Sequence, residues 1–151
     1  MTDLERVFCA APVGPKPVGV YRGEFLGFLD TPGARRIDVQ VLDRLLFVWP
    51  RWGIDFDVSR WWFVHPRAAA GRFRIEHGRS RWRDTAVLQL HYDESRLPVR
   101  SVLYDEIKPL PDGTVLGIGG TNHERGDGDH FFFRLVPLRI AVPEPLAAPA
   151  L

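Results

Sequence analysis

Three side chains that can exchange a proton with a bound molecule are predicted to lie on the same face of one β-hairpin: His77, Asp84 and Tyr92. Because side chains alternate between the two faces of a β-strand, a two-residue turn at Gly78-Arg79 puts all three on the apolar face of a hairpin. The other residues of that face are Phe73, Ile75, Trp82, Ala86, Leu88 and Leu90. Burial there would shift their pKa values and permit acid–base chemistry. In the structural alternative, His77 is near solvent at the hairpin end and Asp84 pairs with an arginine.

A second group of ionisable side chains is the run Tyr104-Asp105-Glu106. Adjacent strand residues point to opposite faces, so at least one of these two carboxylates must face the interior of the domain. An inward carboxylate needs a compensating partner or a chemical role. Without a partner, Asp105 is a candidate catalytic residue together with His77 and Asp84. The partners that would make it structural are His65, Arg74 and Arg100.

Metal, nucleotide and nucleophile chemistry have little support in the sequence. The chain has 5 histidines, but no two of them stand two or four residues apart, which argues against a metal site. The polar run 122–130 lacks the oxygen spacing of a calcium loop and predicts an exposed hairpin loop. No Gly-x-Ser-x-Gly elbow occurs, and the glycines of 117–120 are not followed by the lysine of a phosphate loop. We therefore expect neither a metal nor another cofactor.

Composition and charge limit the partners that can be expected. A formal net charge of +1 argues against a dedicated nucleic-acid binder. No stretch approaches the roughly 20 apolar residues that span a bilayer, so we expect no membrane partner. Cys9 is the single cysteine, and the residues that follow Met1 lack the form of a secretory signal. We expect a cytoplasmic protein.

Turn-forming residues recur about every eight to twelve residues between β-branched and aromatic runs, which is typical of an all-β sandwich or barrel. The expected strands are 18–29, 35–42, 45–49, 53–58, 60–65, 71–77, 81–92, 99–107, 114–120 and 130–136. Their one-sided amphipathic patterns favour an antiparallel barrel of eight to ten strands over residues 18–138. Residues 1–17 are expected to be a flexible lead-in and 139–151 a Pro/Ala-rich tail. One short helix could begin at Ser59 and run through Arg60-Trp61-Trp62-Phe63.

Several short motifs follow one another along the chain: Gly23-Glu24-Phe25-Leu26-Gly27, Trp52-Gly53-Ile54-Asp55-Phe56, Tyr104-Asp105, Asp112 to Ile118, and Phe131 to Leu135. In this order they resemble the motifs of the GXWXG-domain proteins of bacteria and fungi, within the broader class of calycin barrels. The first motif corresponds to the one that names the family, with Phe25 in the tryptophan position. The resemblance covers residues 20–138 and implies a lipocalin-like fold, while it leaves the chemistry open.

These observations favour a barrel whose interior binds a small hydrophobic molecule. The residues expected to line it are Phe25, Phe73, Trp82, Leu88, Tyr92, Tyr104 and Phe133. One alternative is a cofactor-independent isomerase or cyclase for a polyketide- or terpenoid-like substrate, with His77, Asp84 or Asp105 moving a proton. Another is an interaction domain with a filled interior and Trp61-Trp62-Phe63 as an exposed anchor. An exposed tryptophan at an edge would favour a homodimer.

Overall fold

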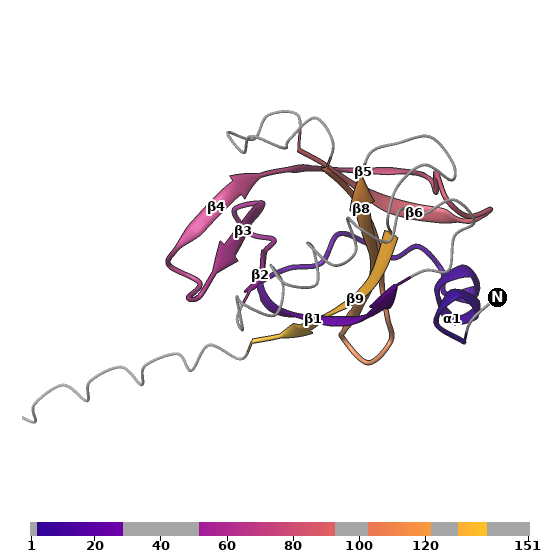
Figure 1. Ribbon diagram of the computed structural model, residues 1–151, viewed down its shortest axis with the longest axis horizontal. Helices are drawn as coiled ribbons and strands as arrows, with labels where there is room; N and C mark the ends of the chain where they lie inside the picture. Colours follow the sequence, from indigo (N-terminus) through magenta and orange to yellow (C-terminus); the bar gives the residue numbers. More distant parts are fainter. Residues whose placement is uncertain (1–2, 29–51, 93–102, 122–129, 139–151) are drawn as a thin grey trace, which may run out of the picture.

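The computed structural model describes residues 3–28, 52–92, 103–121 and 130–138, which form one helix and a ring of nine strands (Figure 1). Helix α1 spans Asp3–Ala10. The strands are β1 (Val20–Phe28), β2 (Trp52–Asp55), β3 (Arg60–Phe63), β4 (Ala69–Arg72), β5 (Arg74–Arg79), β6 (Ala86–His91), β7 (Leu103–Pro109), β8 (Val115–Thr121) and β9 (His130–Pro137). Neighbouring strands are antiparallel in the order β4-β3-β2-β1-β9-β8-β7-β6-β5. The predicted all-β antiparallel barrel is confirmed, while the strands expected at 35–42 and 45–49 lie outside the described residues.

One continuous stretch of chain nearly closes the barrel. β4 and β5 stand at opposite ends of the sheet order, yet only Phe73 separates them in the sequence. β4 pairs with β3 and β5 pairs with β6, so the two halves of this stretch bond to opposite ends of the sheet. A β-bulge at Gly71, whose φ is 73°, bends the stretch just before it changes partner. Glycine suits this position because it adopts the left-handed conformation without steric cost.

Alternate residues of the strands face the two sides of the barrel wall. On β9, Phe131 and Phe133 face inward, whereas Phe132 between them faces outward. We call the inward-facing set the interior cluster; its buried members are Tyr21, Trp52, Ile54, Phe56, Phe73, Leu88, Leu90, Tyr92, Ile107, Val115, Phe131, Phe133 and Leu135. The outer cluster comprises Phe8, Trp82, Val87, Tyr104, Leu116, Ile118 and Phe132. Helix α1 covers this outer cluster through Phe8, which is fully buried beside Phe132.

The two ends of the barrel differ in how the strands are connected. At one end, the turn end, short connections join β2 to β3, β5 to β6 and β7 to β8. At the opposite end, the loop end, the described strands lead into residues 29–51, 93–102 and 122–129. The chain reaches β1 across the turn end: Val13 of the lead-in packs against the interior cluster, and Gly19 N donates to Asp57 Oδ1 at 2.8 Å.

The helix expected after Ser59 is wrong, because residues 60–63 form strand β3 between β2 and β4. Their alternation explains the outcome, since Trp61 and Phe63 pack against the interior cluster and Trp62 faces the other side of the wall. The helix lies instead at Asp3–Ala10. Among the described residues, no helix has the length and apolarity needed to cross a membrane.

The two-residue turn predicted at Gly78-Arg79 is also wrong. β5 continues through Arg79, which pairs with Ala86, and residues 80–85 form the connection. Ser80 begins this connection, because its Oγ accepts hydrogen bonds from the backbone N–H groups of Trp82 at 3.1 Å and Arg83 at 2.8 Å. A serine side chain that satisfies two backbone donors stabilises a tight bend in place of strand pairing.

Candidate functional site

Aromatic side chains line the barrel interior, and glycines on a neighbouring strand make room for them. Phe131 and Phe133 on β9 pair with Gly119 and Gly117 on β8. A Cβ at Gly117 would overlap the Phe133 ring, and one at Gly119 would lie 2.8 Å from Cζ of Phe131. Phe133 in turn contacts Trp52 on the opposite side, with 5.8 Å between ring centroids. Large aromatic rings that meet in this way favour contacts with an apolar molecule.

Asp105 is the carboxylate that strand alternation directs into this interior. It lies on β7 between Leu90 of β6 and Gly119 of β8, and only 4% of its surface is exposed. The Tyr92 hydroxyl donates a hydrogen bond to Oδ2 of Asp105. The indole N–H of Trp61 donates to the Tyr92 oxygen at 2.9 Å. A directed chain of hydrogen bonds therefore starts at Trp61 and ends on Asp105.

The direction of this chain decides which oxygen of Asp105 can hold a proton. The single hydroxyl hydrogen of Tyr92 goes to Oδ2, since the Tyr92 oxygen already accepts from Trp61. Oδ1 has no hydrogen-bond partner among the residues that the structure describes. A proton on Asp105 therefore resides on Oδ1.

Burial sets the protonation behaviour of both members of this pair. Desolvation raises the pKa of Asp105 to about 7, with the Tyr92 hydrogen bond lowering it and the Glu106 charge raising it. Desolvation also raises the pKa of Tyr92 well above its ordinary value, and the Asp105 charge adds to the rise. Tyr92 thus stays protonated at neutral pH while both forms of Asp105 are present. A carboxyl group that titrates near pH 7 is suited to proton transfer.

Burial varies along the interior cluster. Leu88, Ile107 and Leu135, near the turn end, are fully buried. The partly exposed interior residues include Phe63 and Leu103 at the loop end of β3 and β7, and Phe25 and Trp61 farther from that end. Asp105 follows Leu103 as the next inward-facing position of β7. It therefore lies just below the part of the interior that solvent reaches.

The neighbouring carboxylate, Glu106, faces the opposite side of the wall and has a structural role. It accepts hydrogen bonds from the Ser80 hydroxyl at 2.5 Å, from the Arg81 backbone N–H at 2.6 Å and from the Tyr104 hydroxyl at 3.1 Å. Burial raises its pKa and these hydrogen bonds oppose the rise. Glu106 thereby holds the 80–85 connection against the outer cluster. Of the three partners expected for an inward carboxylate, His65 and Arg74 form no hydrogen bond with Asp105 or Glu106, and Arg100 lies outside the described residues.

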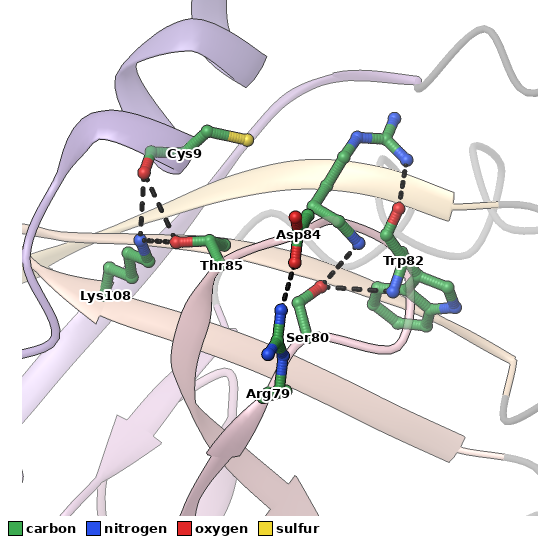
Figure 2. Close-up of polar contacts among 8 residues, drawn as sticks. Cys9, Arg79, Ser80, Trp82, Asp84, Thr85 and Lys108 are labelled. Atoms are coloured by element: carbon green, nitrogen blue, oxygen red, sulfur yellow. Dashed lines mark hydrogen bonds and ion pairs between the residues drawn. The ribbon is translucent and has the colours of Figure 1, made fainter.

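Lys108 fixes helix α1 to the same outer face (Figure 2). Its Nζ donates to the carbonyl oxygen of Ala11 at 2.6 Å, to that of Cys9 at 3.5 Å and to Thr85 Oγ1 at 2.6 Å. Carbonyl groups at a helix C-terminus carry partial negative charge, which an ammonium group stabilises. Burial lowers the pKa of Lys108. This contact is structural and lies on the opposite side of the wall from Asp105.

The structure separates the residues that we expected to line one cavity. The expected residues found in or against the interior cluster are Phe25, Phe73, Leu88, Tyr92 and Phe133. Trp82 and Tyr104 lie in the outer cluster, with 5.2 Å between their ring centroids. Their expected place inside the barrel is wrong. Trp82 lies on the face opposite to the predicted one because the turn begins at Ser80. Tyr104 faces outward because its neighbour Asp105 faces inward.

His77 and Asp84 do not join Asp105 in the interior. His77 pairs with Leu88 but lies exposed on β5, at the end of the sheet order. Asp84 is exposed in the 80–85 connection, where it forms an ion pair with Arg79 (Figure 2). Their predicted burial among apolar residues depended on the turn at Gly78-Arg79, so it fails with that turn. Asp105 is the catalytic candidate that the structure places in the interior.

Trp61 belongs to the site, whereas the interaction-domain alternative expected it in an exposed anchor. Trp61 and Phe63 are partly buried against the interior cluster, and Trp62 is only 2% exposed. The Trp62 indole N–H donates to the backbone oxygen of Tyr21 at 3.1 Å. An exposed Trp61-Trp62-Phe63 anchor is therefore wrong. The period-two alternation of a strand would have revealed that Trp61 faces inward.

Comparison of the chain with protein-family models, with curated proteins and with solved structures finds no match. The part of the resemblance that the structure supports is the nearly closed antiparallel barrel. Within the described residues, no group of three or more His, Cys, Asp or Glu side chains is arranged to hold a metal ion. The function must be argued from the interior itself.

Proposed function

We propose that the barrel binds a small hydrophobic molecule in its interior near the loop end, with Asp105 as the polar contact. The observation that carries this proposal is Oδ1 of Asp105, an oxygen of a side chain that is only 4% exposed and that accepts no hydrogen bond at Oδ1 from the described residues. A largely buried carboxyl group whose hydrogen bonds are incomplete destabilises the fold. A molecule that supplies the missing hydrogen bond offsets that penalty, while aromatic rings bind its apolar part.

The distribution of burial supports the loop end as the place of binding. Leu88, Ile107 and Leu135 near the turn end are fully buried, whereas Phe63 and Leu103 at the loop end retain exposed surface. Ligands of small barrels bind in the mouth, where apolar walls surround a few polar groups. A lipocalin-like use of the barrel, and kinship with the GXWXG-domain proteins, are part of this proposal.

Binding of an uncharged fluorescent probe, N-phenyl-1-naphthylamine, tests the proposal. We expect saturable binding with one probe per chain. Phe25→Ala should weaken it about tenfold, because a large apolar contact is lost. The matched control is Leu26→Ala, since Leu26 is the exposed neighbour that β1 leaves unpaired in its bulge. Equal affinities of Phe25→Ala, Leu26→Ala and the unmodified protein, or no saturable binding, would contradict the proposal.

Acid–base catalysis on the bound molecule is the second candidate, favoured by one observation. Oδ1 is the oxygen of Asp105 that can exchange a proton, and the pKa of this carboxyl is raised to about 7. An isomerase needs only one group that removes a proton and returns it to another carbon of the substrate. Compounds that co-purify with the protein can be identified by native mass spectrometry and then tested for conversion. In an enzyme, Asp105→Asn would abolish conversion and leave affinity within about twofold, whereas a protein that only binds the molecule has no conversion to lose.

A further inference from the structure

The charge of Asp105 is not balanced by a cation among the described residues. The ion pairs among the described residues do not include Asp105. The other buried ionisable or polar residues, Ser80, Glu106, Lys108 and His130, belong to the outer side of the wall. Within the described part of the chain, the carboxylate is hydrogen-bonded to the neutral Tyr92 hydroxyl, and the nearby Glu106 charge repels it. A buried anion without a cation is unfavourable unless something else supplies the positive charge.

The hydrogen bond with Tyr92 does not by itself require a carboxylate at this position. An asparagine has an amide oxygen that could accept the same hydrogen bond and would carry no charge to desolvate. The feature that a carboxylate adds is a negative charge at Oδ1. That charge would strengthen binding of a cation more than binding of a neutral donor.

The rings beside Oδ1 are also suited to a cation. Oδ1 and Cζ of Phe131 lie 2.6 Å and 2.8 Å from the point where a Cβ of Gly119 would stand, so the two atoms are neighbours. The rings of Tyr92 and Trp61 come next along the hydrogen-bond chain that ends on Asp105, with 5.5 Å between their centroids. Aromatic faces attract ammonium groups, and tryptophan does so most strongly. A carboxylate together with these rings can bind both the charge and the apolar part of an amine.

From this arrangement we propose that the molecule bound in the barrel is a hydrophobic amine whose ammonium group donates a hydrogen bond to Oδ1 of Asp105. The inference rests on the proposed binding function and names its ligand class. Tyr92 and Trp61 act as positioning residues, because they occupy Oδ2 and leave Oδ1 to the ligand. Of the residues that the structure describes, the titratable groups that act on Asp105 are Tyr92, beyond β6, and Glu106, on the outer face of β7; the facing positions of β8 and β9 are Gly119 and Phe131.

Two probes that share one ring system test the inference by calorimetry: 1-naphthylmethylamine, an ammonium ion, and 1-naphthylmethanol, its neutral counterpart. At pH 8 the amine should bind about tenfold or more tightly than the alcohol, because a charge-assisted hydrogen bond is stronger than a neutral one. At pH 5.5 the amine is still charged but Asp105 holds a proton. The preference should therefore fall toward unity.

Asp105→Asn should remove the preference for the amine at pH 8 and leave the affinity for the alcohol within about twofold. Glu106→Gln is the matched control: it removes a neighbouring buried carboxylate from the outer side of the wall and should keep the preference. If Asp105→Asn does not fold, the pH dependence of the unmodified protein decides the question. Equal binding of both probes at pH 8 would overturn the amine inference alone, and absence of binding by either probe would overturn the proposed function as well.

Discussion

Asp105 combines two properties that oppose each other, since the burial that makes its proton useful also destabilises the charged form. Its pKa is raised to about 7 from an ordinary value of 3.8. Between these values the folded protein holds a proton that the unfolded chain has lost. The stability contributed by this carboxyl is therefore fully present below about pH 4 and is lost as the pH rises to about 7.

In the variant Asp105→Asn this position does not titrate, so it makes no pH-dependent contribution to stability. We expect the difference in free energy of unfolding, variant minus unmodified protein, to increase by about 2 to 3 kcal/mol between pH 5 and pH 7. Urea unfolding at the two pH values measures it. Asp84→Asn, which removes an exposed carboxylate, should show no comparable change. A difference for Asp105→Asn that stays constant with pH would contradict the assigned burial of the charge.

The glycines of β8 act through the space that they leave free. A Cβ at Gly117 would overlap the Phe133 ring, which is nearly fully buried and has little room to move. We expect Gly117→Ala to lower the free energy of unfolding by about 1 to 3 kcal/mol through overpacking. Gly14→Ala is the control, since its Cβ would meet Pro109 at an ordinary 3.5 Å. Equal stability of the two variants in urea unfolding would disprove this account of the aromatic lining.

At the scale of elements, helix α1 depends on a contact that its own sequence does not contain. Lys108 on β7 satisfies the carbonyl groups of Cys9 and Ala11. Lys108→Met keeps the apolar stem and removes the donors. Hydrogen exchange of α1 should become about tenfold faster in this variant, because about one net hydrogen bond's stability is lost.

The control for that measurement is Lys16→Met, which removes the exposed hydrogen bond with Ser59 at the turn end. Exchange in α1 should then stay unchanged. Unchanged exchange in Lys108→Met as well would mean that Phe8 alone holds the helix in place.

The strands also show which features of the fold could be predicted from the sequence. Alternation correctly put Leu88, Leu90 and Tyr92 on one face and directed one carboxylate of Asp105-Glu106 inward. The alternation of side chains gave wrong faces for residues of the 80–85 connection, because it carries no information about where a strand ends. The decisive interaction was Ser80 accepting two backbone N–H groups, a local signal that competed with the glycine at Gly78.

Contacts between distant strands were beyond sequence reasoning altogether. The hydrogen bond from Trp61 to Tyr92 joins residues 31 positions apart. Burial of Phe8, on α1, depends on the outward face of β9, which no local pattern indicates. The barrel class could be predicted from repeating strands and turns, whereas the chain of donors that isolates Oδ1 needed the folded structure.

At the scale of the whole molecule, barrel closure depends on the bend at Gly71. Its φ of 73° is the left-handed conformation, which other residues adopt at a cost of about 1 to 2 kcal/mol. We expect Gly71→Ala to lower the free energy of unfolding by about that amount in urea unfolding, and Gly14→Ala again serves as the control. Full stability of Gly71→Ala would show that the stretch can close the barrel without this conformation.

Phe73, where the barrel nearly closes, separates the chain into two groups of strands, and each group is consecutive both in the sequence and in the sheet. β1 to β4 form one meander and β5 to β9 a second, and across the sheet the two meet along the β1–β9 ladder. The stretch 69–79 is the covalent link between them. A molecule severed at Phe73 would thus consist of two fragments, each a consecutive run of neighbouring strands, with a seven-position ladder through which to reassemble. The fold contains a natural breakpoint for fragment complementation, and moving the chain ends to this point would give a circular permutant that keeps both meanders intact.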